Sequence, residues 1–186
     1  MHQVECPHRQ ETECNVVSSF CFKQLDISYD HNEILNFYDT NEKHDYFKIM
    51  HPNEVLAKLP SIAKWFTEQK LVPSYVAYIA IKKHFCQVIH IDSGNQQLAI
   101  NFPVYNCDTI TTCFYEVDKS SEKTFISATS KLLATEYTNA TSTICSYILN
   151  KPTLLNLKMP HNVDNNTDAI RYALSFRFKE DPIHLM

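Results

Sequence analysis

The 186-residue chain contains a single glycine, Gly94. A globular chain of this length has on the order of a dozen. Turns that need a positive φ must therefore fall to Asn and Asp, which tolerate the left-handed region better than other residues. Gly94 itself lies two residues after Asp92, where we expect a tight turn to leave a strand.

The chain also lacks a long apolar run and an excess of basic residues. No apolar stretch approaches the roughly 20 residues needed to span a bilayer, so no membrane partner is expected. Lys and Arg number 17 against 21 Asp and Glu, and the net charge of −4 gives no footprint for nucleic acid. Residues 1–10 are polar and have no apolar segment of a secretory signal, which predicts a cytoplasmic, intracellular protein.

The seven cysteines are odd in number and irregularly spaced, and several lie in apolar runs. In a chain without a secretory signal, this pattern favours buried free thiols over a disulfide framework. Cys6, His8, Cys14 and Cys21 leave open a small zinc site, but their spacing fits no standard zinc motif.

Length and apolar content predict one domain over 1–186, with 1–50 as an N-terminal cover and 75–178 as the β core. Residues 25–50 suggest short strands or irregular cover. Residues 52–70 have helical periodicity, with Asn53 as N-cap and Pro60 in the first turn of a second helix. Residues 118–142 are polar and predict a surface loop or a lid, with a short helix over 128–137. Strands are predicted at 75–81, 85–91, 97–104, 110–117, 143–149, 153–158 and 170–178, the fifth and sixth of them forming a hairpin.

The last predicted strand alternates strictly. Its even positions are all apolar, and its odd positions are small or cationic (Arg171, Ala173, Ser175, Arg177). One face should therefore pack a core, and the other should face a polar space that contains two arginines. Seven or more short strands separated by turns indicate a mainly β sandwich or barrel.

Three side chains stand out as candidate metal ligands. His90 and Asp92 occupy positions i and i+2 of a strand, so they point to one face. With His161 they supply two imidazoles and one carboxylate, the facial set that holds non-haem Fe(II) and leaves positions open. A chance His-x-Asp in a chain with nine histidines is the alternative.

The order of these residues resembles that of the Fe(II)/2-oxoglutarate-dependent oxygenases. His90-x-Asp92 is followed about seventy residues later by His161 and ten residues after that by Arg171. Within this superfamily the chain is similar to the aspartyl/asparaginyl β-hydroxylase-like oxygenases of phages and microbes. The resemblance covers roughly residues 52–182 and is carried by the stretches 89–92, 99–107 and 152–178.

The resemblance implies a double-stranded β-helix, that is, a cupin-like jelly roll with a few flanking helices and iron at one mouth. His90, Asp92 and His161 would be the catalytic metal ligands. Arg171 would form a salt bridge with the distal carboxylate of 2-oxoglutarate, for which a planar guanidinium is suited. Family chemistry would then use O₂ to convert 2-oxoglutarate to succinate and to hydroxylate a substrate that the sequence does not identify. A phage-encoded or microbial origin is implied in the same way.

Some positions depart from the family pattern or stay open. Many members have Ser two residues after the arginine, where this chain has Ala173, with its serine at Ser175. Arg177 shares a face with Arg171 and is a second candidate for the carboxylate. Asn101 is a candidate donor to the cosubstrate, and a satisfied sheet residue is the alternative. Tyr115 is another candidate donor to the cosubstrate, but packing in the core is the favoured interpretation for this residue.

Two other kinds of protein fit the same pattern. One is a cupin-type metal protein that uses the triad without 2-oxoglutarate. The other is a non-catalytic jelly roll, such as a viral structural or binding module. The arginine ten residues after His161 favours the oxygenase.

Overall fold

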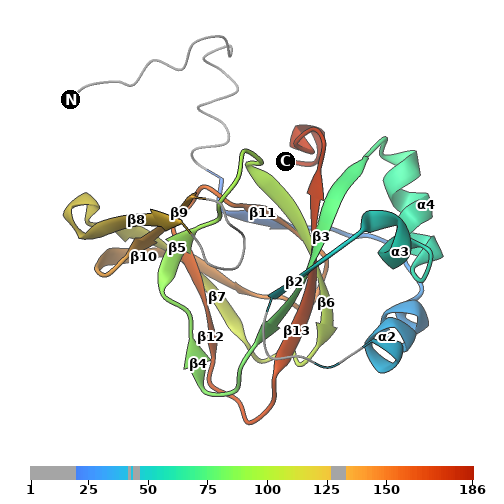
Figure 1. Cartoon of the computed structure of the whole chain (residues 1–186), viewed down its shortest axis with the longest axis horizontal. Coiled ribbons are helices and arrows are strands. Elements are labelled where there is room, and N and C mark those ends of the chain that lie inside the picture. The colour runs from blue at the N-terminus through green and yellow to red at the C-terminus, as the bar shows by residue number, and fades with distance from the viewer. Residues whose placement is uncertain (1–19, 42, 44–46, 127–132) are drawn as a thin grey trace.

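The computed structural model describes residues 20–41, 43, 47–126 and 133–186, which form two antiparallel sheets (Figure 1). The six-stranded sheet has the order β1-β11-β6-β13-β3-β2, and the seven-stranded sheet has the order β10-β7-β12-β5-β9-β8, with β4 paired to β12. This architecture is a mainly β, cupin-like jelly roll, as predicted. The strands of the six-stranded sheet are β1 (Phe22–Gln24), β2 (Phe47–Met50), β3 (Pro73–Ile81), β6 (Leu98–Tyr105), β11 (Thr153–Asn156) and β13 (Arg171–Phe178). Those of the seven-stranded sheet are β4 (Phe85–Cys86), β5 (Ile89–Ile91), β7 (Thr111–Val117), β8 (Glu122–Ile126), β9 (Leu133–Tyr137), β10 (Ala140–Ile148) and β12 (His161–Asn165).

Three helices cover the outer face of the six-stranded sheet (Figure 1). They are α2 (His31–Thr40), α3 (Pro52–Leu56) and α4 (Pro60–Glu68), and two short 3₁₀ turns are η1 (Lys119–Ser121) and η2 (Ile183–Leu185). Each helix buries an apolar stripe against the sheet: Ile34, Phe37, Val55, Ile62 and Phe66. Phe66 is central because its ring meets the rings of Phe102, Phe176 and Phe178 edge-on, at centroid distances of 6.1, 5.0 and 5.3 Å.

Strand β13 separates this core from a cavity between the sheets. Its even side chains Tyr172, Leu174, Phe176 and Phe178 belong to the helix-side core. Its odd side chains Arg171, Ala173, Ser175 and Arg177 line the cavity. The predicted alternation of this strand is confirmed.

Several elements differ from the sequence-based expectations. The stretch 31–40 is a helix, because Asp30 caps it by accepting a hydrogen bond from the Asn32 amide at 2.9 Å and its apolar positions fall on one face. Helices α3 and α4 are confirmed, but α3 is capped by His51 rather than Asn53. The predicted strand over 85–91 is divided into β4 and β5.

The segment 118–142 was expected to be a loop or a short helix, and both expectations are wrong for its described part. Strands β8 and β9 form an antiparallel ladder there, and β9 also pairs with β5. The hairpin predicted between 143–149 and 153–158 is wrong too. Strand β10 pairs with β7, and β11 pairs with β6 and β1, so the connection crosses from one sheet to the other. No helix in the described ranges is long and apolar enough to cross a membrane.

We expect Phe66→Ala to lower the free energy of unfolding by about 3–5 kcal/mol, because the ring is buried among three other aromatic rings. Urea denaturation followed by circular dichroism measures this. Phe125→Ala is the matched control, since Phe125 is 41% exposed on β8 and should change the free energy by less than about 0.5 kcal/mol. Equal losses for the two variants would contradict the packing described for α4.

Candidate metal centre and cosubstrate pocket

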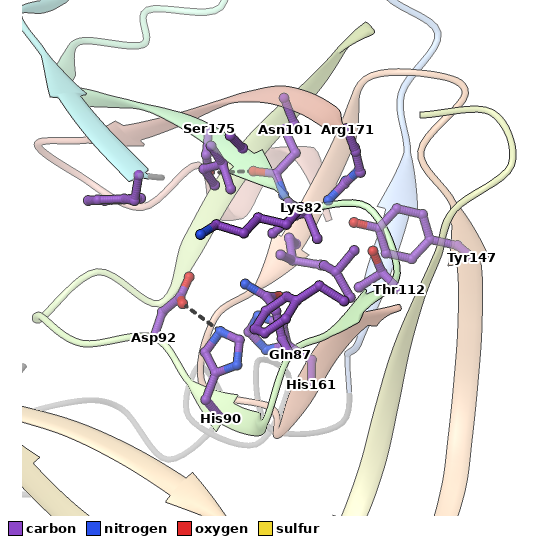
Figure 2. Close-up of a pocket in the computed structure, with 18 of the residues that line it drawn as sticks. Lys82, Gln87, His90, Asp92, Asn101, Thr112, Tyr147, His161, Arg171 and Ser175 are labelled. Carbon is purple, nitrogen blue, oxygen red and sulfur yellow. Dashed lines mark hydrogen bonds and ion pairs between the residues drawn. The ribbon is translucent and has the colours of Figure 1, made fainter. Parts of the chain in front are cut away.

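The register of two neighbouring strands brings the candidate metal ligands together. His161 on β12 is the direct cross-strand partner of His90 on β5, and their ring centroids lie 4.6 Å apart. Asp92 follows the last residue of β5, and its Oδ1 lies 3.4 Å from His90 Nε2. One ligand atom from each of the three residues lies within 4.8 Å of the others (Figure 2). This spacing allows the three side chains to hold one metal ion.

Both imidazoles are oriented by the same type of hydrogen bond. His90 Nδ1 lies 2.9 Å from the carbonyl oxygen of Val88, and His161 Nδ1 lies 2.8 Å from that of Met159. A carbonyl oxygen only accepts, so Nδ1 carries the proton in each ring. In the neutral ring the lone pair is thereby left on Nε2, as in most metal-binding histidines with an oriented outer partner. Without a metal, a proton on His90 Nε2 would instead be donated to Asp92 Oδ1, which lies 3.4 Å away.

Asp92 is held by an arginine from the opposite sheet. Arg177 Nη2 on β13 donates to Asp92 Oδ2 at 2.6 Å, and the Arg177 side chain is only 7% exposed. Burial alone would raise the pKa of Asp92, but Arg177 and the hydrogen bond with His90 together hold this pKa well below its usual range. Asp92 is therefore a carboxylate at any physiological pH.

The pKa values of the two histidines shift in opposite directions. Burial lowers the pKa of His161 to about 4, with a further contribution from the neighbouring His90, so this ring is neutral near pH 7. Burial also lowers the pKa of His90, but Asp92, the carbonyl of Val88 and Glu136 together raise it, and the net direction is upward.

The triad lines a cavity of about 540 Å³ between the two sheets. Arg171 on β13 lies in the same cavity with Thr112 and Tyr147, away from His90 and Asp92 (Figure 2). Arg171 is 3% exposed, and its Nε has no hydrogen-bond partner among the described residues. The buried hydroxyls of Thr112 and Tyr147 lie close to one another and to Asn101 in the same part of the cavity. A buried guanidinium and two buried hydroxyls in one part of the cavity fit an anionic group there.

The other predicted pocket residues are linked by a series of hydrogen bonds that ends at Asp92. Asn101 Oδ1 accepts a short hydrogen bond from Ser175 Oγ, which in turn accepts from Arg177 Nη1 at 3.0 Å. Arg177 therefore has protein partners for both terminal nitrogens, whereas Arg171 has no carboxylate partner in the described chain. Asn101 lines the cavity and is also a satisfied sheet residue.

Tyr115 is not among the residues that line the cavity. Its hydroxyl donates to Asn162 Oδ1 at 3.1 Å, and Asn162 Nδ2 in turn donates to the carbonyl of Gln87 at 3.2 Å. The predicted zinc ligands Cys6, His8 and Cys14 lie outside the described residues. Within the described ranges, His90, Asp92 and His161 are the only group of three or more potential ligands close enough for one ion.

Sequence reasoning did not identify four polar residues of the cavity: Thr112, Tyr147, Lys82 and Gln87. Thr112 shares the inward face of β7 with the buried Phe114, so strand alternation could have found it. Tyr147 could not have been found in this way, because β10 carries two register shifts before it. Lys82 and Gln87 lie beside the short strands β4 and β5, where periodicity gives little signal.

No protein-family model and no curated protein matches the chain. Solved structures with a similar fold are found. Apo HygX from Streptomyces hygroscopicus is 12% identical with a TM-score of 0.48, over 91% of this chain and 86% of HygX. HygX with nickel and 2-oxoglutarate bound is 8% identical with a TM-score of 0.47, over 91% and 86%. The non-heme alpha-ketoglutarate-dependent carbocyclase SnoK from nogalamycin biosynthesis is 5% identical with a TM-score of 0.46, over 91% and 84%. At these identities and TM-scores, the chemistry of the site rests on its own side chains.

We expect His161→Ala to weaken Fe(II) or Co(II) binding by more than about 100-fold, beyond what changes outside the ligand shell usually cause. Anaerobic titration followed by visible absorption of Co(II) measures the dissociation constant. His84→Ala is the control, since His84 is exposed and pairs with Asp168 outside the triad. Equal affinities of the His161→Ala variant and the unmodified protein would refute the ligand assignment.

Proposed function

We propose that the protein is a non-haem Fe(II)- and 2-oxoglutarate-dependent oxygenase. His90, Asp92 and His161 would hold the iron, and Arg171 would hold the distal carboxylate of 2-oxoglutarate. The observation that carries this proposal is the buried guanidinium of Arg171, which lies in the cavity that the triad lines and has no carboxylate partner among the described residues. A buried cation without a counter-ion is costly, so a site of this kind is built for an anionic ligand.

The charges of the cavity agree with a dianionic cosubstrate. Two guanidinium groups face it from β13, and Asp92 neutralises one of them. Arg171 then remains as a net positive charge, and a divalent metal on the triad would add two more. A 2-oxoglutarate dianion would offset two of these three positive charges, with its keto-acid end toward the metal and its distal carboxylate toward Arg171, Thr112 and Tyr147.

In the proposed reaction, the residues of the chain would orient the metal ligands and enclose the site. Bound iron and 2-oxoglutarate would supply the oxidising chemistry, in which O₂ converts 2-oxoglutarate to succinate and CO₂ and oxidises a substrate C–H bond. The histidines are oriented by backbone carbonyls, and Asp92 by Arg177. The walls of the cavity, including Leu155, Val163 and Ala173, would limit access of bulk water to the site.

The roles of the two arginines follow from their partners. Arg177 would keep Asp92 ionised and in place, and Asn101 and Ser175 would keep Arg177 in place. Asn101 could also donate through its amide nitrogen to the cosubstrate. The aspartyl/asparaginyl hydroxylase-like subtype, the hydroxylation outcome and a phage origin stay predictions from the sequence.

Turnover of 2-oxoglutarate tests the proposed reaction without knowledge of the substrate. We expect the protein with Fe(II), ascorbate and O₂ to convert 2-oxoglutarate slowly to succinate, and Asp92→Ala to abolish this conversion. Quantification of succinate by mass spectrometry is the measurement. Metal binding without 2-oxoglutarate binding would instead indicate the cupin-type alternative, and binding of neither would indicate a non-catalytic jelly roll.

Replacing each arginine in turn separates their roles. We expect Arg171→Met to weaken 2-oxoglutarate binding to the metal-loaded protein by 30-fold or more, since losing one partner of a buried charge pair costs about 2–5 kcal/mol. Its affinity for Co(II) alone should stay unchanged. Arg177→Met should instead weaken Co(II) binding. Isothermal titration of both ligands measures this, and the reverse pattern would assign the cosubstrate to Arg177.

A further inference from the structure

Lys158 contacts the segment that carries Asp92. It lies between β11 and β12, three residues before His161, and is half-buried. Its Nζ donates to the backbone carbonyl oxygen of Asp92 at 2.9 Å and to that of Gly94 at 2.7 Å. One ammonium group therefore joins the two parts of the metal triad, which are far apart in the sequence.

The backbone of Asp92 is bound on both sides by the same short segment. Its amide donates to the carbonyl oxygen of Leu157 at 3.0 Å, while its carbonyl accepts from Lys158. Lys158 is itself fixed, because its amide donates to Asn156 Oδ1 at 2.9 Å. The position of Asp92 relative to β12 thus depends on residues 157 and 158.

The turn at Gly94 brings two carbonyl oxygens toward one point. Gly94 has a φ of 97°, in the region that favours glycine. Two carbonyl dipoles that converge repel each other unless a cation or donors lie between them. An ammonium group has three N–H donors and a compact charge, so it satisfies both oxygens at once.

A depression of about 360 Å³ lies next to this turn, lined by residues 91–95, by Lys158 and by Leu133 and Thr135 of β9. Lys158 therefore lies on the wall of this depression and also contacts the two carbonyl oxygens of the turn.

We propose that Lys158 is a positioning residue, which fixes the backbone of Asp92 so that its carboxylate reaches the metal together with His161. Arg177 holds the carboxylate itself, and Lys158 holds the main chain from which it projects. This inference rests on the proposed metal site. It predicts that loss of the ammonium group changes the geometry and affinity of the metal site more than the stability of the fold.

The single glycine allows a direct test of the contact. Protein made by cell-free synthesis with carbonyl-¹³C glycine gives one backbone carbonyl resonance, that of Gly94, which accepts from Lys158. We expect Lys158→Met to move this resonance. Lys151→Met is the matched control, because Lys151 pairs with Asp26 away from the triad, and it should leave the resonance in place.

Co(II) binding to the same variants tests the positioning role. Lys158→Met should raise the dissociation constant for Co(II) about 10- to 100-fold and alter the visible spectrum of the bound ion. Lys158→Arg keeps the charge and donors and should restore most of the affinity, and Lys151→Met should match the unmodified protein. Thermal unfolding of each apo-protein shows whether a variant has lost its fold.

Each outcome decides one question. An unmoved Gly94 resonance, or a Lys158→Met variant with unchanged Co(II) affinity and spectrum, overturns the role of Lys158 and leaves the metal site intact. A lower melting temperature with an unchanged Co(II) spectrum makes Lys158 a structural residue only and also overturns its role. If the unmodified protein binds no Co(II), the metal site and the positioning role fail together, even where the Gly94 resonance moves.

Discussion

The ion pair between Arg177 and Asp92 is the contact on which the arrangement of the site depends. It joins the six-stranded sheet, which carries Arg177 on β13, to the end of β5 in the seven-stranded sheet. The triad comes entirely from the seven-stranded sheet, whereas both arginines come from the other. Without this pair, Asp92 would be a partly buried carboxylate beside two imidazoles, with no fixed direction for its second oxygen. The pair thus sets the distance between the metal ligands and the wall of the cavity that carries Arg171.

The two arginines of β13 show how one strand can serve two purposes. Each is nearly inaccessible to solvent, and each would be destabilising if left unpaired. Arg177 is neutralised by Asp92, whereas Arg171 has no carboxylate partner among the described residues. A fold selected only for stability would gain from an apolar side chain at Arg171, because burying an unpaired charge lowers the free energy of unfolding. The cost is understandable if a ligand offsets it, as in a binding site that is completed only when an anion enters.

Sequence patterns predicted the elements with clear periodicity and failed where pairing is decided by tertiary contacts. The alternation of β13 and the helical stripe over 52–70 could be read directly, since one face of each is apolar. Helix α2 was missed because its aromatic and acidic residues resemble those of a short strand, and only its cap at Asp30 and its packing distinguish it. Strands β10 and β11 follow each other as hairpin strands would, yet they join different sheets. Nothing local in the intervening turn specifies that crossing.

For the candidate site, too, prediction from the sequence failed where the answer depends on tertiary contacts. Spacing along the chain was enough to suggest His90, Asp92 and His161, because a strand register aligns the first and third and the pleat aligns the first two. Strand alternation could not separate Arg171 from Arg177, which share a face of β13, and only the spacing from His161 favoured Arg171. The two arginines differ in their ion pairing. Asp92, 85 residues before Arg177 and next to the other sheet, pairs with Arg177 and not with Arg171. The role of a buried charge therefore depends on which counter-charges the fold supplies, and Arg171, which has no carboxylate partner among the described residues, is where the proposed ligand would bind.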